Sequence, residues 1–235
     1  MKIALVMSGH MRSFQECFSS QEKYLLSVLN PDVYIHTWDE THSKTQSWHN
    51  QNGKSVPLTD DHLNDIETMY SPKSLLVERQ EKCENYPFLY GTQMSLCGLK
   101  NMTYGIYRSH QLMVESDIDY DVIVRFRPDI LLKEEITPEY KNITESNVLF
   151  YGNPNPPVSN ATAKKGYHNY RALDIFSFST YAASQYVFGT HKEFEKYYHK
   201  TEWNHTPQLD YAIDNGINPI VSEEYLYDKC WYIKR

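Results

Sequence analysis

The sequence has little of what usually marks a protein's compartment. It carries only four cysteines among 235 residues, Cys17, Cys83, Cys97 and Cys230, and no Cys-x-x-Cys pair. This spacing signals neither a zinc site nor a disulfide framework, so buried free thiols are expected. No apolar run approaches the roughly 18 residues of a membrane helix, and the five-residue run after Lys2 is too short for a signal-peptide core. We therefore expect a cytoplasmic protein without a membrane span, in the host cytoplasm if the protein is viral.

An excess of positive charge is also absent. Lysine and arginine number 23 against 30 acidic residues, a formal net charge of -7, which argues against a non-specific nucleic-acid binder. An anionic ligand would need local positive charge. The content of 40% hydrophobic and 23% charged residues is typical of a globular protein. The 20 tyrosines are explained by general composition and packing, or by stacking surfaces for bases or sugars.

Apolar runs alternate with helical spacing along the chain. "KIALVM" predicts a buried strand that ends at the turn "SGH". "SFQECFSSQEKYLLSVL" predicts a helix that Ser13 can cap, and "DVYIHTW" predicts a second strand. A strand, a helix and a strand joined by short links favour parallel pairing with a right-handed crossover. We therefore expect an α/β domain with a central, mostly parallel sheet flanked by helices.

The remaining pattern extends this architecture. Residues 40 to 62 indicate a loop, and residues 153 to 171 indicate a long loop with three prolines and the pair Lys164-Lys165, a candidate lid. Helical spacing from Met94 to Met113 predicts a long amphipathic helix. Further helices are expected in "DDHLNDIETMY", "YAASQYVFGTHKEFEKYYH" and "PQLDYAIDNG", the last ended by Gly216, and further strands in "SLLVER", "YDVIVRFRPDI", "VLFYGN" and "DIFSFST".

Polar residues follow several of the predicted strands. Ligands of open α/β sheets bind at the carboxyl ends of the strands. The first two strands and the strand after the long helix are followed by, or end in, Ser8, Gly9, His10, Arg12, His36, Thr37, Trp38, Asp39, Arg125, Arg127 and Asp129. Arginine suits phosphate oxygens, glycine permits close backbone approach, and aromatic rings stack on bases. The pattern favours a phosphorylated ligand that carries a base, with Trp38 and Tyr104 as base contacts.

Each motif also has a structural interpretation. "SGHMR" is neither a dinucleotide fingerprint nor a P-loop, and it could be a tight turn with a solvated arginine. "HTWD" could simply be packed. In "RFRPD", an extended strand would place Arg125, Arg127 and Asp129 on one face, and Pro128 would end the strand and present Asp129 at the sheet edge. The alternative for these three residues is an ion-pair network that holds the fold.

The stretch "YDVIVRFRPDI" resembles a strand of GT-A-type glycosyltransferases, in which an Asp-x-Asp motif holds a divalent metal against the diphosphate of a nucleotide sugar. Arg127-Pro128-Asp129 stands where that motif would be. With "SGHMR" and "PDVYIHTWD", the chain is similar to a group of microbial and viral glycosyltransferase-like proteins that share an Arg-x-Arg-Pro-Asp motif. The resemblance covers roughly residues 1 to 220.

This resemblance implies a single GT-A-like domain over residues 1–235, with a nucleotide-sugar-binding half (1–130) and an acceptor-side half (131–235). The implied reaction transfers a sugar from a nucleoside-diphosphate sugar donor to a glycan or another hydroxyl acceptor. Arg12, Arg125 and Arg127 are expected to stabilise the leaving diphosphate. Asp174 is the candidate general base, unless it caps a helix or pairs with Arg171. The alternative bases are Glu202 and His205.

The chain departs from the family pattern at the metal site. Arginine is permanently protonated and cannot bind a metal, so Arg127 removes one ligand. Asp129 alone could hold Mg²⁺ or Mn²⁺ with water and the diphosphate. Alternatively, arginines neutralise the diphosphate and the metal is dispensable, since a cation about 4 Å from a phosphate oxygen gains about 4 kcal/mol at an effective dielectric near 20. We expect a divalent cation that assists.

Two other functions stay open at this point. A nucleotidyltransferase that makes nucleotide sugars would need a longer glycine-rich loop with a lysine after the first strand, and "SGHMRSF" lacks both. A non-catalytic module that binds a sugar or a nucleotide is the second alternative. Turnover of a nucleotide sugar to free nucleotide would distinguish the transferase from both.

Overall fold

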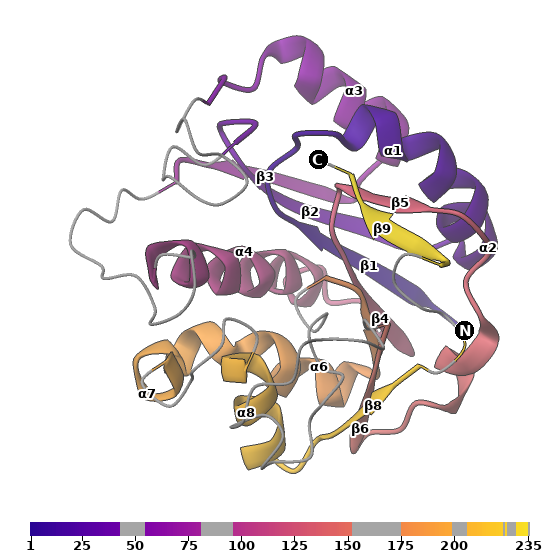
Figure 1. Cartoon of the computed structure of the whole chain (residues 1–235), viewed down its shortest axis with the longest axis vertical. Coiled ribbons are helices and arrows are strands. Elements are labelled where there is room, and N and C mark those ends of the chain that lie inside the picture. Colours follow the sequence, from indigo (N-terminus) through magenta and orange to yellow (C-terminus); the bar gives the residue numbers. More distant parts are fainter. Residues whose placement is uncertain are drawn as a thin grey trace.

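The computed structural model describes residues 1–42, 55–80, 96–151, 175–198, 206–222, 224 and 229–234. In these parts of the chain a seven-stranded sheet lies between helices on its two faces (Figure 1). This arrangement confirms the predicted α/β class with a central, mostly parallel sheet. None of the described helices is long and apolar enough to cross a membrane.

The sheet has the strand order β3-β2-β1-β4-β7-β6-β8. Neighbouring strands are parallel except at β7, which runs antiparallel to both β4 and β6. The carboxyl ends of β1 to β4 therefore meet at one edge of the sheet. The bounds of these strands are β1 Ile3–Ser8, β2 Asp32–Trp38, β3 Ser74–Glu78, β4 Val122–Phe126, β6 Asn147–Phe150, β7 Ser177–Ser179 and β8 Asn218–Val221.

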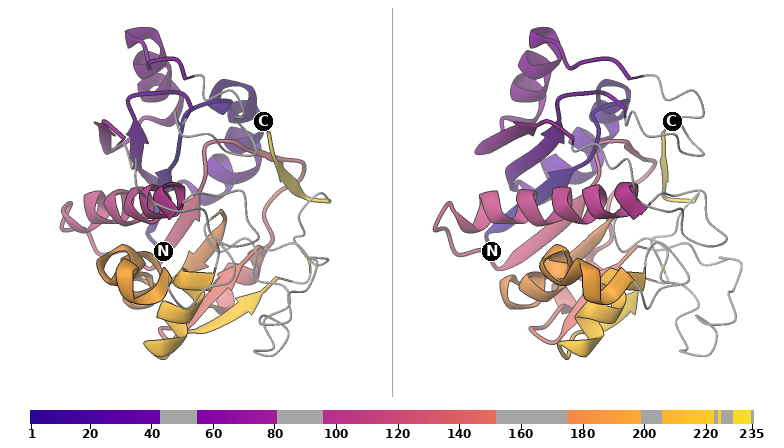
Figure 2. Two further views of the ribbon diagram at one scale, coloured as in Figure 1. Left: turned by 60° about the vertical axis from the view of Figure 1, so that its left-hand side comes forward. Right: turned by 90° about the vertical axis from the view of Figure 1, so that its left-hand side faces the viewer.

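Helices cover both faces of this sheet. One face is packed by α1 Phe14–Gln21, η1 Glu22–Leu26, α2 Ser27–Leu29 and α3 Asp60–Tyr70, together with a two-stranded sheet of β5 Ile130–Leu132 and β9 Trp231–Ile233. On the other face α4 lies beside α6 in both views of Figure 2. That layer consists of α4 Leu96–Val114, α6 Tyr181–Phe188, η3 Gly189–Glu193, α7 Phe194–Tyr198 and α8 Thr206–Asp214, and the short η2 Pro138–Asn142 follows β5.

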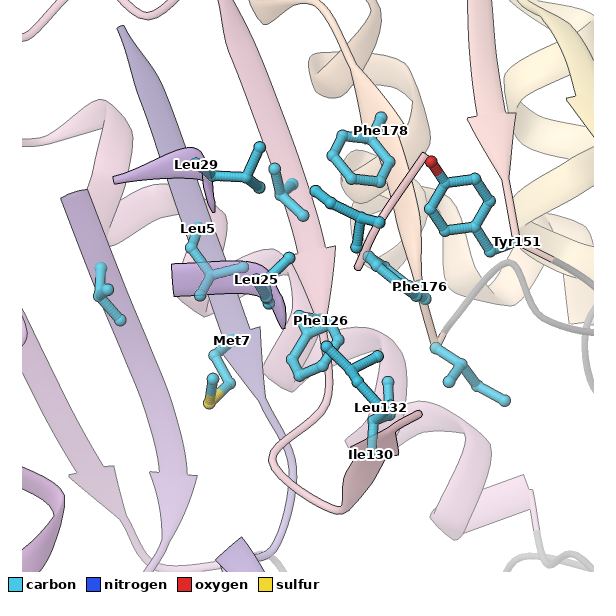
Figure 3. Packing of buried hydrophobic residues seen from close by; sticks show 14 of the residues in the cluster. Leu5, Met7, Leu25, Leu29, Phe126, Ile130, Leu132, Tyr151, Phe176 and Phe178 are labelled. Carbon is cyan, nitrogen blue, oxygen red and sulfur yellow. The ribbon is translucent and has the colours of Figure 1, made fainter. Parts of the chain in front are cut away.

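The strand β1 shows why the sheet is buried on both sides. All six of its residues are buried. Leu5 and Met7 pack against the α1 layer, while Ala4 and Val6 pack against the α4 layer, as the alternation of side chains along a strand requires. Figure 3 shows Leu5 and Met7 lying with Phe126 of β4 in the first of these cores. A central parallel strand covered on both faces is apolar throughout, which is the pattern of "KIALVM".

Most predicted elements are confirmed, and the differences concern caps, bounds and short elements. Ser13 precedes α1, but its hydroxyl donates to the Lys234 carbonyl at 3.0 Å and does not cap the helix. β4 ends at Phe126, so the alternation expected through Asp129 stops before the Arg-Pro-Asp turn. The strands β8 and β9 and the short η2 were not expected, β5 is separate from β4, and the helix expected from Tyr181 is divided into α6, η3 and α7. The loop at 153–171, with Lys164 and Lys165, lies outside the described residues.

The cysteines differ in part from the expectation. Cys17 and Cys230 are buried free thiols, as predicted. Cys97 instead forms a disulfide, so the prediction of free thiols is wrong for this residue. The spacing of cysteines in the sequence could not reveal the bond, because a disulfide forms only where folding brings two cysteines into the required geometry. Cys83 lies outside the described residues.

Candidate functional site

The candidate site lies where the carboxyl ends of β1, β2, β3 and β4 meet. Strand register places Ser8 beside His36, and Trp38 beside Glu78. Gly9 follows β1 with a φ of 137°, which favours glycine. A Cβ on Gly9 would lie 3.5 Å from Cδ of Pro128, so the turn after β1 packs against the Arg-Pro-Asp turn.

Three charged residues form what we call the arginine cluster: Arg12, Arg127 and Asp129. Nε and Nη2 of Arg127 donate to the two carboxylate oxygens of Asp129 at 2.8 and 2.6 Å. Nε of Arg12 lies 3.3 Å from Asp129 Oδ2. The Asp129 side chain is 1% exposed, whereas those of Arg12 and Arg127 are 18% and 20% exposed. Pro128 does follow the end of β4 and places Asp129 at the sheet edge, but the carboxylate is not presented there, because it turns inward to the two guanidiniums.

The neighbours of Asp129 determine its charge. Burial alone would raise the pKa of this carboxyl, but the guanidiniums of Arg127 and Arg12 outweigh burial and lower the pKa below its usual value. The carboxylate is therefore ionised at neutral pH. Because both arginines stay protonated, the cluster keeps one net positive charge at this edge of an acidic protein.

The backbone of the Arg-Pro-Asp turn is held from three sides. Nε2 of Gln21 donates to the carbonyls of Pro128 and Ile130 at 3.0 and 2.8 Å. The Tyr70 hydroxyl of α3 donates to Gln21 Oε1 at 2.7 Å. The backbone N–H of Lys234, just after β9, donates to the Asp129 carbonyl at 2.7 Å. These contacts fix the turn independently of any ligand.

Arg125 occupies a different position from Arg127. It is 2% exposed, and its guanidinium donates to the carbonyls of Ser8, at 3.1 Å, and Phe126. This side chain joins the carboxyl ends of β1 and β4 beneath the site. The geometry favours a structural role, and the predicted contact of Arg125 with the nucleotide sugar stays a prediction.

A second group, the aromatic cluster, consists of His36, Trp38, Glu78 and Tyr104. The hydroxyl of Tyr104 donates to both oxygens of Glu78 at 3.2 and 3.1 Å. The Tyr104 ring stacks on Trp38 with centroids 5.9 Å apart and an interplanar angle of 25°. His36 meets both rings edge-on, at 4.8 and 5.7 Å. Trp38 and Tyr104, predicted as base contacts, are thus brought together.

The histidines of the site are neutral. Burial lowers the pKa of His36 to about 4, although Glu78 partly opposes this shift. Its Nε2–H therefore donates to Glu78 at 3.0 Å. Burial also lowers the pKa of His10 to about 4, and the charges of Arg12 and Arg127 act in the same direction. Because Nδ1 of His10 lies 2.9 Å from the Glu40 carbonyl, Nδ1 carries the proton and Nε2 is an acceptor.

Glu78 is the site residue that the sequence interpretation missed. Its carboxylate holds Tyr104 and His36, and Nε of Arg108 lies 3.8 Å away. The signal was present in "SLLVER", where a charged residue ends an apolar run. Polar residues at the carboxyl ends of parallel strands are candidate site residues, and Glu78 is one of them.

The structure places the predicted residues in three groups. Gly9, His10, Arg12, Trp38, Tyr104, Arg127 and Asp129 gather at the common edge of the strands. Ser8, His36, Thr37 and Arg125 are buried at the strand ends, and the Thr37 hydroxyl donates to the Gly9 carbonyl at 2.9 Å. Asp174, Arg171, Glu202 and His205 lie outside the described residues, so the proposed bases stay predictions.

A metal does not fit the groups that surround Asp129. Both of its oxygens accept hydrogen bonds from the guanidinium of Arg127, and Arg12 forms an ion pair with Oδ2. Across the described ranges, no three His, Cys, Asp or Glu side chains are grouped so that they could hold a metal ion. A hard cation at Asp129 would have to displace an arginine and remain beside two positive charges.

Comparison with known proteins adds no family assignment. No protein-family model matches this chain, and no curated protein matches it closely enough to count as a relative.

Proposed function

We propose that the protein is a glycosyltransferase that moves a sugar from a nucleoside-diphosphate sugar to a hydroxyl of a glycan or another acceptor. The observation that carries this proposal is the pair of partly exposed arginine side chains, Arg12 and Arg127, on a buried carboxylate at the carboxyl ends of parallel strands. Guanidinium groups bind phosphate oxygens with two hydrogen bonds each, and fixed positive charge stabilises a departing diphosphate.

The aromatic cluster supports a ligand that carries a base. Tyr104 is the partly exposed member of a stacked pair at the same edge of the sheet, and the buried Trp38 supports its ring. The His10 ring lies 6.4 Å from Trp38. A neutral His10 with Nε2 as acceptor can take a hydrogen bond from a ribose or sugar hydroxyl. We assign donor binding to residues 1–130. The Lys234 N–H, just after β9, supports the arginine cluster through its hydrogen bond to the Asp129 carbonyl. The acceptor is assigned to the half from 131 to 235.

In the proposed reaction the acceptor oxygen forms a bond to the anomeric carbon. The bond from that carbon to the diphosphate oxygen breaks, and the diphosphate leaves with the electron pair beside Arg12 and Arg127. If the reaction inverts the anomeric centre, the hydroxyl proton passes to a general base, for which Asp174 is our candidate. The contribution of such a base is typically about 10² to 10⁴-fold in rate.

A ligand screen tests this proposal. Thermal unfolding is followed with a panel of nucleoside diphosphates and nucleotide sugars, because a ligand at 100 times its Kd adds about 2.7 kcal/mol of stability. Release of free nucleoside diphosphate is then measured with candidate acceptors. We expect stabilisation by a nucleotide sugar and acceptor-dependent release. A binding module would be stabilised without release, and a nucleotidyltransferase would convert nucleotide sugar and pyrophosphate to nucleoside triphosphate and sugar 1-phosphate.

Variants sharpen the screen. Arg127→Ala should lose most of the ligand-induced stabilisation, because a charge-assisted contact to phosphate disappears. Lys73→Ala is the matched control, since Lys73 is also a cation in an ion pair, with Asp32 at the opposite end of β2. Equal ligand-induced stabilisation of wild type and a folded Arg127→Ala protein would contradict the phosphate assignment.

A further inference from the structure

We infer that Asp129 is a positioning residue and not a metal ligand, and that Arg12 and Arg127 bind the donor diphosphate without a divalent cation. This inference rests on the proposed function and deepens it. The resemblance to GT-A enzymes implies a metal at this turn, whereas the observed groups assign its task to the two arginines.

The first step is the state of the carboxylate. The two oxygens of Asp129 accept hydrogen bonds from Nε and Nη2 of Arg127, and Nε of Arg12 lies 3.3 Å from Oδ2 in an ion pair. Mg²⁺ binds a carboxylate oxygen at about 2.1 Å and keeps several waters. A side chain that is 1% exposed between two guanidiniums offers neither the oxygen nor the space for those waters.

The second step is what the carboxylate does for the arginines. An arginine side chain loses about 2 kcal/mol of rotamer entropy when it is immobilised. Asp129 fixes both guanidiniums before any ligand arrives, and Gln21 and Lys234 fix the backbone of the turn that carries it. The exposed parts of Arg12 and Arg127 are therefore held in place at one edge, which lowers the cost of binding an anion.

The third step is the charge balance. The two guanidiniums and one carboxylate leave one net positive charge. A divalent cation would raise this to three positive charges within a few ångströms. Repulsion between the cation and the guanidiniums would then disfavour metal binding. A diphosphate instead meets positive charge on two planar donors, and this geometry suits its oxygens.

Calorimetry with and without metal tests the inference. UDP, GDP, CDP and ADP are titrated into the full chain in EDTA and, separately, in Mn²⁺ or Mg²⁺. We expect one of them to bind with affinities that agree within about threefold in all three conditions. Binding that requires Mn²⁺ or Mg²⁺, or that weakens more than tenfold in EDTA, overturns the inference and leaves the proposed function standing. Absence of binding in every condition overturns both.

Variants separate positioning from ligation. Asp129→Asn should weaken nucleoside-diphosphate binding about tenfold, equally in EDTA and in Mn²⁺. If Asp129 were a ligand, the loss would appear only with the metal, and if its role were only to stabilise the fold, the folded variant would bind like wild type. Should Asp129→Asn fail to fold, Arg12→Lys and Arg127→Lys keep the charge and remove the planar donors. They should weaken binding about tenfold regardless of metal, and restoration of wild-type affinity by Mn²⁺ would contradict the inference.

Discussion

The guanidinium of Arg127 compensates the charge of the buried Asp129 carboxylate. Removing one partner of a buried ion pair costs about 3–5 kcal/mol, because the remaining charge loses its compensation. We therefore expect Arg127→Met to lower the free energy of unfolding by about 3 kcal/mol at pH 7, somewhat offset by the remaining contact of Asp129 with Arg12. Urea denaturation measures this loss. The double variant Arg127→Met/Asp129→Asn should lose less than the single one, and a greater loss would contradict a buried ionised carboxylate.

Gly105 gives a second prediction at the scale of single residues. A Cβ at this position of α4 would lie 3.2 Å from Nδ1 of the buried His36 and 3.6 Å from the Cβ of Ser8. Overpacking of this kind costs about 1–3 kcal/mol, more than the roughly 1 kcal/mol that alanine gains over glycine within a helix. Gly105→Ala should therefore be destabilised by about 1 kcal/mol in chemical denaturation. Gly189→Ala, whose Cβ would meet the Tyr211 ring at 3.4 Å, is the control for ordinary contact. A stabilised Gly105→Ala protein would show that the His36 ring moves away from the added Cβ at little cost.

At the scale of elements, the strand β9 is stabilised by one of its two faces. Trp231 is fully buried and meets Phe176 edge-on at 6.0 Å, whereas Tyr232 is partly buried, with Nζ of Lys133 over its ring. Trp231→Ala should lower the free energy of unfolding by about 3–5 kcal/mol, and Tyr232→Ala by less than about 1 kcal/mol. Paired denaturation curves check the difference. Equal losses would contradict the expectation that the buried face of β9 contributes more to the stability of the fold than the partly exposed face.

Elements with long patterns could be predicted from sequence, and those with short patterns could not. The helix spacing from Met94 to Met113 and the run "KIALVM" extend over enough residues to specify α4 and β1. β9 has three residues, and its pairing with β5 depends on how folding brings two distant segments together. The alternation in "RFRPD" predicted one face for three side chains, but Pro128 ends the strand and lets Asp129 turn inward. The ion-pair alternative for Arg127 and Asp129 was the correct description of their contacts.

The site could be predicted as a place but not as a set of contacts. Parallel strands bring their carboxyl ends together, so the gathering of Gly9, Arg12, Trp38 and Arg127 follows from the order of elements. The partners of each charge do not follow from sequence, because they depend on side-chain directions across elements far apart in the chain. Glu78 was missed for this reason, since only the packing of α4 on the sheet brings Tyr104 to its carboxylate.

For the whole molecule, buried neutral histidines predict sensitivity to acid. Burial lowers the pKa of His36 to about 4 and that of His110 to about 3, while an unfolded histidine titrates near 6.5. Below pH 6.5 these histidines bind protons in the unfolded chain but stay neutral in the folded chain. The free energy of unfolding therefore decreases as the pH is lowered. Each histidine contributes a loss of about 1.4 kcal/mol per pH unit, or on the order of 2 kcal/mol at pH 5.

Urea denaturation at pH 7, 6 and 5 measures this effect. His110→Gln removes one of the titrating groups while keeping a donor near the Ser184 hydroxyl, which lies 2.8 Å from His110 Nε2. Its free energy of unfolding should fall less steeply between pH 7 and 5 than that of wild type. A wild-type profile that is flat over this range would contradict the neutral, buried state of both histidines.

The pairing of β9 with β5 has a consequence for the time course of folding. Ile130 pairs with Ile233, and the Lys234 N–H reaches the Asp129 carbonyl, so contacts around the arginine cluster join residues far apart in the chain. Contacts of high sequence separation carry a large loop-closure entropy and tend to form late. Because β5 and β9 form a separate two-stranded sheet with three residues in each strand, we expect this pair to form after the seven-stranded sheet. Substitutions in β9 should then accelerate unfolding while leaving the rate of folding nearly unchanged.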